Sequence, residues 1–410
     1  MSRKTDIAIL GGGLAGLSLA YFLTTEQPEA EQAVNGPEDN SEKSPSHPSQ
    51  NTGKKLSVTV IDDGAGKPDH MWGFWDGGEE WLAPVRDLVR KHYNSWSHWQ
   101  IAGPSGGHVM QGRQYSYAAI SANVFLKSLK QKCAESNVRF IPGSIKNVEK
   151  QNSICRIKLN NGDVLKAKEV FDTVGYRQPE NIMLQHFHGW QIETRQNCFN
   201  PGQAMLMDFR VSQEAGIHFM YLLPFSEHHA LVESTVFSRE PQKTAWYEAQ
   251  ITTYLYNRYR LASGDYKTVS QEQGVLPMAP LTANVIENSL PMGLPAGAMR
   301  SSSSYAFSQI LRQAHQLGRR RDDQPVIPLA GCDGVELWMD RVFLQVLDRH
   351  AELAPDIFAA MAQRMNGDYF ARFMNGHAGW RPKLSVIRSV PTGPFIHEAL
   401  GLKGANQKRA

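Results

Sequence analysis

The first hydrophobic segments of the chain alternate between strand-like and helix-like patterns. Asp6–Leu10 is a short apolar run typical of a buried strand, and Leu14–Leu23 is a longer run of small and apolar residues with helical character. A second strand-like run, Leu56–Ile61, follows only after residues 24–55, which are rich in polar residues, glycine and proline. Such a composition buries too little apolar surface to offset the entropy of ordering, so we expect a surface insertion there.

One helix and several short strands are predicted before residue 177. Apolar positions repeat at helical spacing over Val124–Cys133. Asn160–Gly162 is typical of a hairpin turn between two strands. The strand-like runs are Val138–Ile141, Ile154–Leu159, Val164–Lys166 and Val170–Tyr176.

The pattern changes after residue 188, where strand-like runs follow one another at hairpin spacing and indicate an antiparallel sheet. These runs are Gly189–Thr194, Ala204–Arg210, His218–Pro224 and Ala230–Phe237. Two acids, Asp208 and Glu233, interrupt the apolar runs. They either face solvent on the outer side of the sheet or face inward. If they face inward, desolvation raises their pKa and favours the neutral acid, which can donate a proton.

Helical patterns dominate the remainder of the chain. Ala306–Leu317 is predicted as a helix, with serines before it that could cap its start. Residues 331–402 carry helical apolar stripes interleaved with basic residues such as Arg341, Arg381 and Lys383. This surface would suit contact with anionic lipid, or it is an ordinary helix face that seals a cavity.

The glycines of the first turn indicate a dinucleotide site. Gly11, Gly13 and Gly16 stand at G-x-G-x-x-G spacing between the first strand and the helix that begins with Leu14 and Ala15. The first glycine permits the turn, the second lets the backbone approach a pyrophosphate, and the third lets helix and strand pack closely. The helix N-terminus then offers free N–H groups and partial positive charge to the diphosphate.

An acidic residue at the end of the second strand normally binds a ribose hydroxyl, roughly 20 residues after the glycines. Here Asp62 closes that strand, displaced along the sequence by the insertion, and Asp63 is the alternative. We expect Asp62 to fill this role.

Composition narrows the function classes. The 410 residues carry 43 Lys and Arg against 40 Asp and Glu, a net charge of +3, so nucleic acid is not implied as a partner. No uncharged apolar run approaches the roughly 18 residues that a spanning helix needs. The four cysteines lie far apart without a C-x-x-C pair, which predicts a reduced cytoplasm and no metal site.

An aromatic segment follows the second strand. Met71–Trp75 holds three aromatic side chains and a methionine, and Trp81, Trp96 and Trp99 add to the aromatic density shortly after it. Such a cluster is either part of the core or an apolar wall beside a large apolar ligand.

The order of these segments resembles the flavin-dependent lycopene cyclases of bacterial and plant carotenoid synthesis over nearly the whole chain. The order of blocks is more specific than any one block. The blocks that carry the resemblance are Gly11–Leu17, Val60–Asp62, Trp72–Trp75, Tyr115, Ile120–Ser121, Phe125, Asp172, Gly175–Tyr176, Gly189–Trp190, Met207–Asp208, Tyr221, Leu223–Pro224, Leu231–Thr235 and Gly274–Pro277.

The resemblance implies a fold class and a division of the chain. The fold is expected to be α/β, with a Rossmann-like FAD-binding domain, an antiparallel-sheet substrate domain and a helical C-terminal region. The expected parts are 1–190 for FAD, 191–280 for substrate, 281–330 as a return to the FAD part, and 331–410 as the helical region.

The resemblance also implies an isomerase that cyclises the ψ-ends of a linear carotenoid without net electron transfer. Glu233 takes the place of the family's essential glutamate and protonates the terminal double bond, and Asp208 is expected as its electrostatic partner. FAD is implied in its reduced form, with NAD(P)H as the electron source. Cofactor contacts are expected from Asp172, Gly297, Ser303 and Tyr305 in addition to the glycine turn.

One segment departs from the family pattern. Where typical cyclases have a His-Pro-Thr-Thr-Gly-Tyr-Ser run, this chain has Arg300–Ala306, with four serines and Tyr305. The run loses its glycine, which reduces backbone freedom near the flavin ring. The departure bears on the substrate or on the flavin's redox role more than on flavin binding.

Other readings stay open from sequence alone. An FAD-dependent monooxygenase or halogenase acting on an aromatic or isoprenoid substrate would share the N-terminal block, but Ala296–Ala298 lacks the acid of that class's flavin motif. A non-catalytic carotenoid-binding protein is a third possibility. Because polyenes reside in membranes, we expect a cytoplasmic protein peripherally bound to the inner face of the membrane. The sequence does not define the polyene, the number of ends cyclised, the ring type or the oligomeric state.

Overall fold

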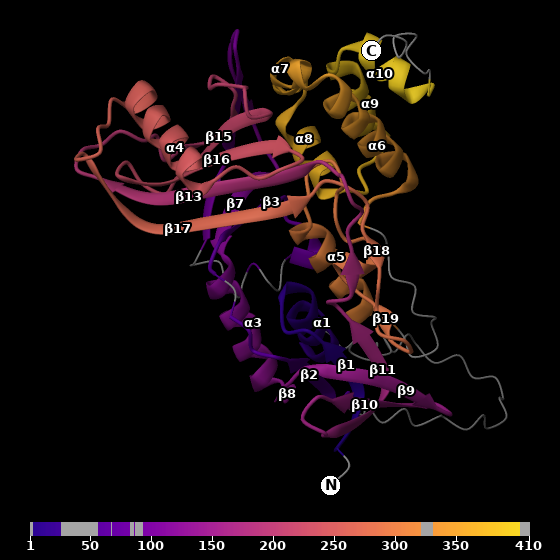
Figure 1. The fold of residues 1–410 in the computed structure, drawn as a ribbon. Coiled ribbons are helices and arrows are strands. Elements are labelled where there is room, and N and C mark those ends of the chain that lie inside the picture. Colours follow the sequence, from indigo (N-terminus) through magenta and orange to yellow (C-terminus); the bar gives the residue numbers. More distant parts are fainter. Residues whose placement is uncertain are drawn as a thin grey trace, which may run out of the picture.

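The computed structural model describes residues 3–25, 56–66, 68–82, 86, 93–320 and 331–401. These residues form a lower part around a mostly parallel sheet and an upper part that combines a large sheet with a group of C-terminal helices (Figure 1). The insertion expected at residues 24–55 lies outside the described residues, except for Thr24 and Thr25, which end the first helix.

The lower sheet begins with β1, Arg3–Leu10, which pairs in parallel with β2 on one side and β11 on the other. Its order is β8-β2-β1-β11-β10-β9, with β19 pairing β11. β10 and β9 extend it as antiparallel strands beyond β11. The further strands are β2 Val58–Asp62, β8 Arg139–Pro142, β9 Ile145–Gln151, β10 Ile154–Leu159, β11 Val164–Asp172 and β19 Leu290–Pro291.

Three helices pack together against this sheet and complete its core. They are α1 Leu14–Thr25, α3 Ala122–Glu135 and α5 Phe307–Gly318. Nine consecutive residues of α1 are buried, which explains why its sequence is apolar on every side. α1 lies between α3 and α5, so its start is held in place above the end of β1. The Rossmann-like fold expected from the sequence is confirmed.

The upper part contains a seven-stranded sheet in the order β17-β13-β16-β15-β14-β5-β6. All neighbours are antiparallel except β14 and β5, which run in parallel. Helix α4, Thr244–Tyr259, covers one face (Figure 1). The strands are β5 His98–Gly103, β6 Gly106–Gln111, β13 Leu184–Thr194, β14 Gln203–Asp208, β15 Ile217–Pro224, β16 His229–Ser238 and β17 Tyr266–Pro277.

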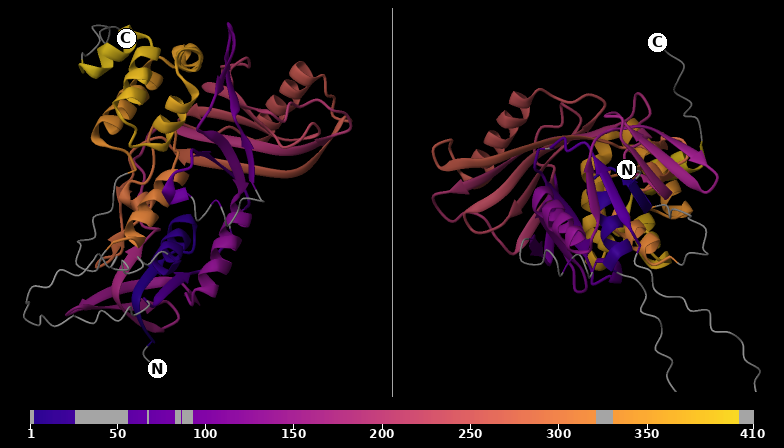
Figure 2. Two further views of the ribbon diagram at one scale, coloured as in Figure 1. Left: turned by 180° about the vertical axis from the view of Figure 1, so that it is seen from behind. Right: turned by 90° about the horizontal axis from the view of Figure 1, so that it is seen from below.

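A small sheet, β3-β7-β4, and short helices connect the two parts. Its strands are β3 Met71–Asp76, β4 Tyr93–Trp96 and β7 Ser116–Ser121, and β12 Tyr176–Arg177 pairs separately with β18 Thr282–Ala283. Two views show the C-terminal helices and α4 on opposite sides of the upper part (Figure 2). These helices are α6 Gly334–Arg349, α7 Ala354–Arg364, α8 Gly367–Asn375, α9 Trp380–Ser389 and α10 Thr392–Ala399; the one-turn helices are η1 Glu80–Leu82, η3 Leu294–Ala296 and η4 Ala351–Leu353.

The structure corrects two sequence expectations. Val164–Lys166 and Val170–Tyr176 were expected as separate strands, but β11 is continuous and ends at Asp172, because parallel pairing with β1 extends along its whole length. The serines before α5 do not cap it. Its N-cap is Ala306, without a side-chain cap, and Ser304 instead donates to the carbonyl of Pro277 at 2.8 Å.

The expected division into parts remains a prediction. β5 and β6 bring residues 98–111 into the large sheet, and β13 enters it already at Leu184. The pairing of β14 with β5 shows how an early segment reaches the later sheet.

Candidate active site

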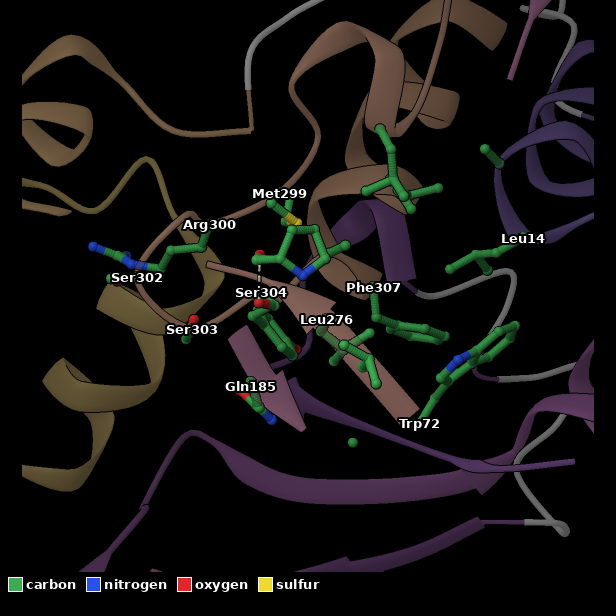
Figure 3. A pocket seen from close by; sticks show the side chains of 18 of the residues that line it. Leu14, Trp72, Gln185, Leu276, Met299, Arg300, Ser302, Ser303, Ser304 and Phe307 are labelled. Carbon is green, nitrogen blue, oxygen red and sulfur yellow. Dashed lines mark hydrogen bonds between the residues drawn. The ribbon is translucent and has the colours of Figure 1, made fainter. Parts of the chain in front are cut away.

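A cavity of about 1810 Å³ lies between the lower and upper parts of the described molecule. Its wall combines the first turn after β1, one face of the large sheet, the serine-rich turn before α5, and the C-terminal helices. Part of this wall is shown in Figure 3, where Leu14, Trp72 and Phe307 lie at one side and Arg300 and the serines at the other. We call this space the central cavity. The glycine turn and the predicted acid therefore border one continuous space.

The glycine turn, Gly11–Gly16, has the geometry that its spacing predicted. Gly11 has a φ of +103°, and a Cβ at Gly16 would lie 2.0 Å from the carbonyl oxygen of Gly11, so neither position accepts a side chain without rearrangement. A Cβ at Gly13 would meet nothing within 4 Å, which leaves the backbone open toward a ligand. Gly11, Gly13, Leu14 and Ala15 line the central cavity, and Gly16 packs beneath them.

The carboxylate of Asp62 braces the glycine turn. It accepts hydrogen bonds from the N–H of Gly12 at 2.6 Å and of Gly64 at 2.9 Å, and it lines the central cavity. The ends of β1 and β2 are thereby fixed beside the N-terminus of α1. The open backbone at Gly13 and the helix N-terminus offer N–H donors, and the acid at the end of β2 offers an acceptor. Together they fit a dinucleotide cofactor.

Asp172 shapes the next segment of the same wall. Its buried carboxylate accepts from the N–H groups of Val174, Gly175 and Ile286 at 2.9 to 3.0 Å, which holds the turn after β11 against the turn before β19. Asp172 lines the central cavity, but both oxygens already bind backbone of this chain. Like Asp62, it fixes the backbone around a cofactor site while it borders the cavity.

The segment from Gly297 to Tyr305 contributes unevenly. Gly297 takes a φ of +71° at the end of η3 and is not among the described residues that line the cavity. Ser303 lines the cavity, and its Oγ has no hydrogen-bond partner among the described residues (Figure 3). The hydroxyl of Tyr305, also in the wall, accepts from the N–H of Trp75 at 3.1 Å and lies 2.9 Å from Oγ of Ser308.

The large sheet places Glu233 in a row with three residues from neighbouring strands. In register, Tyr221 of β15 pairs with Glu233 of β16, Glu233 pairs with Gly189 of β13, and Gly189 pairs with Glu272 of β17. We call these four residues the Glu233 row. Cross-strand partners point to the same face. Glu233 and Glu272 are only 8% and 7% exposed.

Gly189 allows the two acids of this row to approach each other. A Cβ on Gly189 would lie 3.3 Å from Cγ of Glu272 and 3.4 Å from Cβ of Glu233, so a side chain there would occupy the space between them. Without it, the carboxyl groups meet above the middle strand. The Gly189–Trp190 block of the sequence thus has a physical explanation.

Both carboxyl groups have a raised pKa. Burial, followed by the charge of Glu272, raises the pKa of Glu233. Burial also raises the pKa of Glu272, against a hydrogen bond at 2.8 Å from the N–H of Met71 that lowers it. Thr235 donates its hydroxyl to Oε1 of Glu233 at 2.5 Å, which leaves Oε2 to carry a proton.

Aromatic side chains surround this acid pair. The hydroxyl groups of Tyr221 and Tyr117 lie 2.8 Å apart, and the ring of Trp75 lies 4.6 Å from that of Tyr117 between centroids. Burial raises the pKa of Tyr117 to about 12, so it is neutral. All three line the central cavity, so Met71–Trp75 is both core and cavity wall. Electron-rich rings beside a proton donor can stabilise a cation.

Asp208 lies elsewhere. It is fully buried, forms a two-point ion pair with Arg210 at 2.6 and 2.7 Å, and accepts from the hydroxyl of Tyr254 on α4 at 3.0 Å. It is not among the described residues that line the central cavity. The structure therefore does not bring Asp208 to Glu233, and its expected role as electrostatic partner has no geometric support.

Glu272 is the acid beside Glu233 that sequence reasoning did not identify. It stands in a polar stretch, Ser270–Gln273, which carries no apolar alternation to mark an inward position. Only the register of β17 against β13 reveals it.

The cavity reaches the surface among the C-terminal helices. Trp338, Ile387 and Ile396 line the central cavity and are also 39%, 43% and 54% exposed. We call the exposed apolar side chains of α6, α9 and α10, with the residue after α10, the apolar rim; they are Leu337, Trp338, Trp380, Leu384, Ile387, Ile396 and Leu400. Large exposed apolar groups that gather around an opening mark a site of interaction.

Basic side chains lie on the same helices as the apolar rim, but one of those expected at the surface is buried. Arg341 and Arg381 are exposed, as expected for a surface facing anionic groups. Lys383 is not, because it is 5% exposed and its Nζ pairs with Asp333. No helix of the described residues combines the length and apolar character needed to cross a membrane.

Comparison with known proteins found relatives that match most of the chain. A family model described as lycopene cyclase protein matches residues 45–399. Lycopene beta-cyclases from a Paracoccus species and from Pantoea ananas are each 23% identical to the chain, with 95% and 97% coverage of both proteins.

Solved structures show the same fold at low sequence identity. A geranylgeranyl bacteriochlorophyll reductase-like protein from Thermoplasma acidophilum matches with a TM-score of 0.57 and 10% identity, covering 97% of this chain and 99% of its own. The flavin-dependent brominase Bmp2 matches with a TM-score of 0.56 and 12% identity, covering 93% and 97%. Since the family model spans most of the sequence, the chain belongs to the lycopene cyclase family.

Proposed function

We propose that this protein is a flavin-dependent enzyme that cyclises the ψ-ends of a linear carotenoid, as in the conversion of lycopene to β-carotene. The observation that carries the proposal is Glu233, a buried carboxyl with a raised pKa in a large aromatic cavity that also borders the glycine turn. The names of the related lycopene beta-cyclases support the same substrate class.

FAD fits the residues at the lower end of the cavity. Gly13 and the N-terminus of α1 would receive the diphosphate, Asp62 would face the ribose, and Ser303 and Tyr305 would border the ring. In the reduced, anionic form, with NAD(P)H as electron source, FAD would supply negative charge near a developing cation. The Oγ of Ser303 has no hydrogen-bond partner among the described residues and could bind such a ligand.

Glu233 would act as the acid. The end of a linear carotene carries no polar group that the enzyme could bind by hydrogen bonds. The rate must therefore come from positioning, from a strong acid in a dry cavity and from stabilisation of a carbocation. The proton on Oε2 would add to the terminal double bond, the next double bond along the chain would attack the resulting cation and close a six-membered ring, and a ring proton would then return to the Glu233–Glu272 pair. Glu233 and Glu272 together hold one proton before and after, so the reaction is an isomerisation.

Aromatic side chains near Glu233 would protect the cation. Tyr221 and Tyr117 are held by their mutual hydrogen bond and keep their hydroxyl oxygens away from a reactive carbon. Phe219 and Phe237 line the same face of the sheet and exclude water. A dry pocket of neutral rings favours ring closure over capture of the cation by water.

Substrate would enter from a membrane surface. Three members of the apolar rim, Trp338, Ile387 and Ile396, line the cavity and are also exposed at the surface. The exposed Arg341 and Arg381 on the same helices suit anionic headgroups. Docking of this rim would let a polyene pass from the bilayer into the cavity without crossing water. We place the enzyme at the cytoplasmic side of the membrane.

Glu233→Gln tests the proposal because it removes the acidic proton while keeping the size of the side chain. The variant is expressed in cells that accumulate a linear carotene, and pigments are separated by chromatography. We expect loss of cyclised product by at least 100-fold with flavin still bound. Glu193→Gln, an exposed acid on β13, serves as the control. Ring formation at the wild-type rate in Glu233→Gln would remove this residue from the chemistry.

The family match does not favour the alternative function, an FAD-dependent monooxygenase or halogenase. The match to a brominase concerns the fold, at 12% identity. Oxygen and NADPH consumption coupled to substrate would support that reading, and their absence during cyclisation would exclude it.

A further inference from the structure

A buried ion pair lies in the wall of the central cavity where the serine-rich turn meets the C-terminal helices. Arg300 is fully buried, and Asp340 on α6 is 2% exposed. Nε and one terminal nitrogen of Arg300 both donate to Oδ1 of Asp340, at 3.1 and 2.8 Å. Both residues line the central cavity, and neither has a part in the proposed proton transfer.

The remaining contacts of Arg300 fix its orientation. Its other terminal nitrogen donates to the carbonyl of Phe373 on α8, and its guanidinium carbon lies 3.8 Å from the centre of the Phe373 ring. Figure 3 shows the side chain extending from the turn toward the C-terminal helices. Two nitrogens of the guanidinium thus bind the same oxygen of Asp340, Oδ1, and the ion pair is not bidentate at the carboxylate.

The second oxygen of Asp340 is left without a partner. Among the described residues, Oδ2 is buried and makes no hydrogen bond. An unsatisfied buried carboxylate oxygen is costly, so such atoms in native structures point to a partner supplied from elsewhere. Asp340 itself lines the cavity, so a molecule that occupies the cavity could supply such a partner.

We propose that the Arg300–Asp340 pair recognises a hydroxyl group on the substrate, so that this enzyme prefers a linear carotenoid with an alcohol near one end over a pure hydrocarbon. This inference rests on the proposed function. The apolar neighbours Met339, Phe373 and Met374 suit a polyene chain but offer no donor to Oδ2. An N–H of a flavin ring is the other source of the same hydrogen bond.

The position of Arg300 in the sequence supports a role specific to this chain. Arg300 opens the segment that departs from the family's His-Pro-Thr-Thr-Gly-Tyr-Ser run. Its backbone is locked to the turn, because its N–H donates to the carbonyl of Tyr305 at 2.8 Å. The departure thereby places a buried ion pair beside the serines of this turn, in the wall of the cavity.

The test compares two polyenes in competition. Flavin-loaded enzyme in lipid vesicles receives equal amounts of lycopene and of lycopene in which one terminal double bond has been hydrated to a tertiary alcohol. Relative kcat/KM is read from products, and binding of each polyene is read separately from quenching of tryptophan fluorescence. We expect the wild type to prefer the alcohol by about 10- to 100-fold in both readouts, the value of a hydrogen bond to a charged group.

Variants assign this preference to the pair. Arg300→Met/Asp340→Leu replaces both charges with apolar side chains, an exchange that usually preserves folding better than loss of one partner. We expect the preference to fall to near one, while Asp348→Asn, an exposed acid on the same helix, keeps the wild-type ratio. Flavin content is measured by absorption in every sample.

Each contrary outcome has a distinct meaning. Equal binding of both polyenes by the wild type, or a preference that survives in the double variant, overturns the inference. Loss of flavin with an unchanged preference also overturns it and assigns Oδ2 to the cofactor. Preferential binding of the alcohol without any cyclisation refutes the proposed function and leaves the recognition site standing.

Discussion

Replacement of Glu272 by Gln tests whether two neighbouring acids set the working pH of this enzyme. The amide keeps the shape of the side chain, and its oxygen can still accept from the N–H of Met71. The change removes a charge beside Glu233 while burial of Glu233 stays the same. We therefore expect the variant to remain active at low pH and to lose activity at a lower pH than the wild type.

The size of this shift follows from the register of the sheet. Since both side chains contact the position that a Cβ of Gly189 would take, at 3.3 and 3.4 Å, they begin within about 7 Å of each other. At an effective dielectric constant of about 20, two charges about 6 Å apart repel by roughly 3 kcal/mol, or about two pKa units. Partial screening makes a shift of one to two units the expected result.

The assay uses vesicles that contain a linear carotene and enzyme kept under reducing conditions between about pH 5 and pH 9. Initial rates of cyclisation are measured by chromatography, and Glu193→Gln on the exposed part of β13 is the control. An unchanged alkaline limb would show that Glu272 does not influence the acid. Loss of activity at every pH would show instead that Glu272 itself removes the ring proton.

Three further predictions concern stability, geometry and location. Because burial raises the pKa of Glu233, the unfolded chain loses this proton at a lower pH than the folded protein, so wild-type stability falls as the pH rises from about 4 toward neutrality. The free energy of unfolding of Glu233→Gln, measured with denaturant relative to the wild type, should therefore be higher at pH 8 than at pH 5 by about 1–3 kcal/mol. The same difference between variant and wild type at both pH values would refute this. Gly189→Val should lower cyclisation at least 10-fold with flavin retained, whereas wild-type turnover would contradict the close approach of the acids. Trp380→Asp/Ile396→Asp should weaken sedimentation with anionic vesicles several-fold, and unchanged binding would exclude the apolar rim.

The sequence predicted those elements whose patterns depend on local physics. The apolar run before Gly11, the small residues of α1 and the strands around Glu233 follow directly from periodicity. The serine turn was misjudged because caps depend on backbone angles that composition does not define. The face that Asp208 occupies could not be predicted, because β14 is irregular, with a register shift between Met205 and Asp208, so alternation does not tell which face it occupies.

The arrangement of the acid site explains why it could not be read from the chain. Glu233 and Glu272 lie on strands that never pair with each other, and their approach depends on the absence of a side chain at Gly189 on the strand between them. A glycine is an unfavourable strand residue, since it loses entropy and offers nothing to pack. Its place in the middle of β13 is understandable only if the close approach of two carboxyl groups is the feature that matters. A pair of acids that share one proton in an apolar cavity gives up stability in order to keep a proton donor at neutral pH.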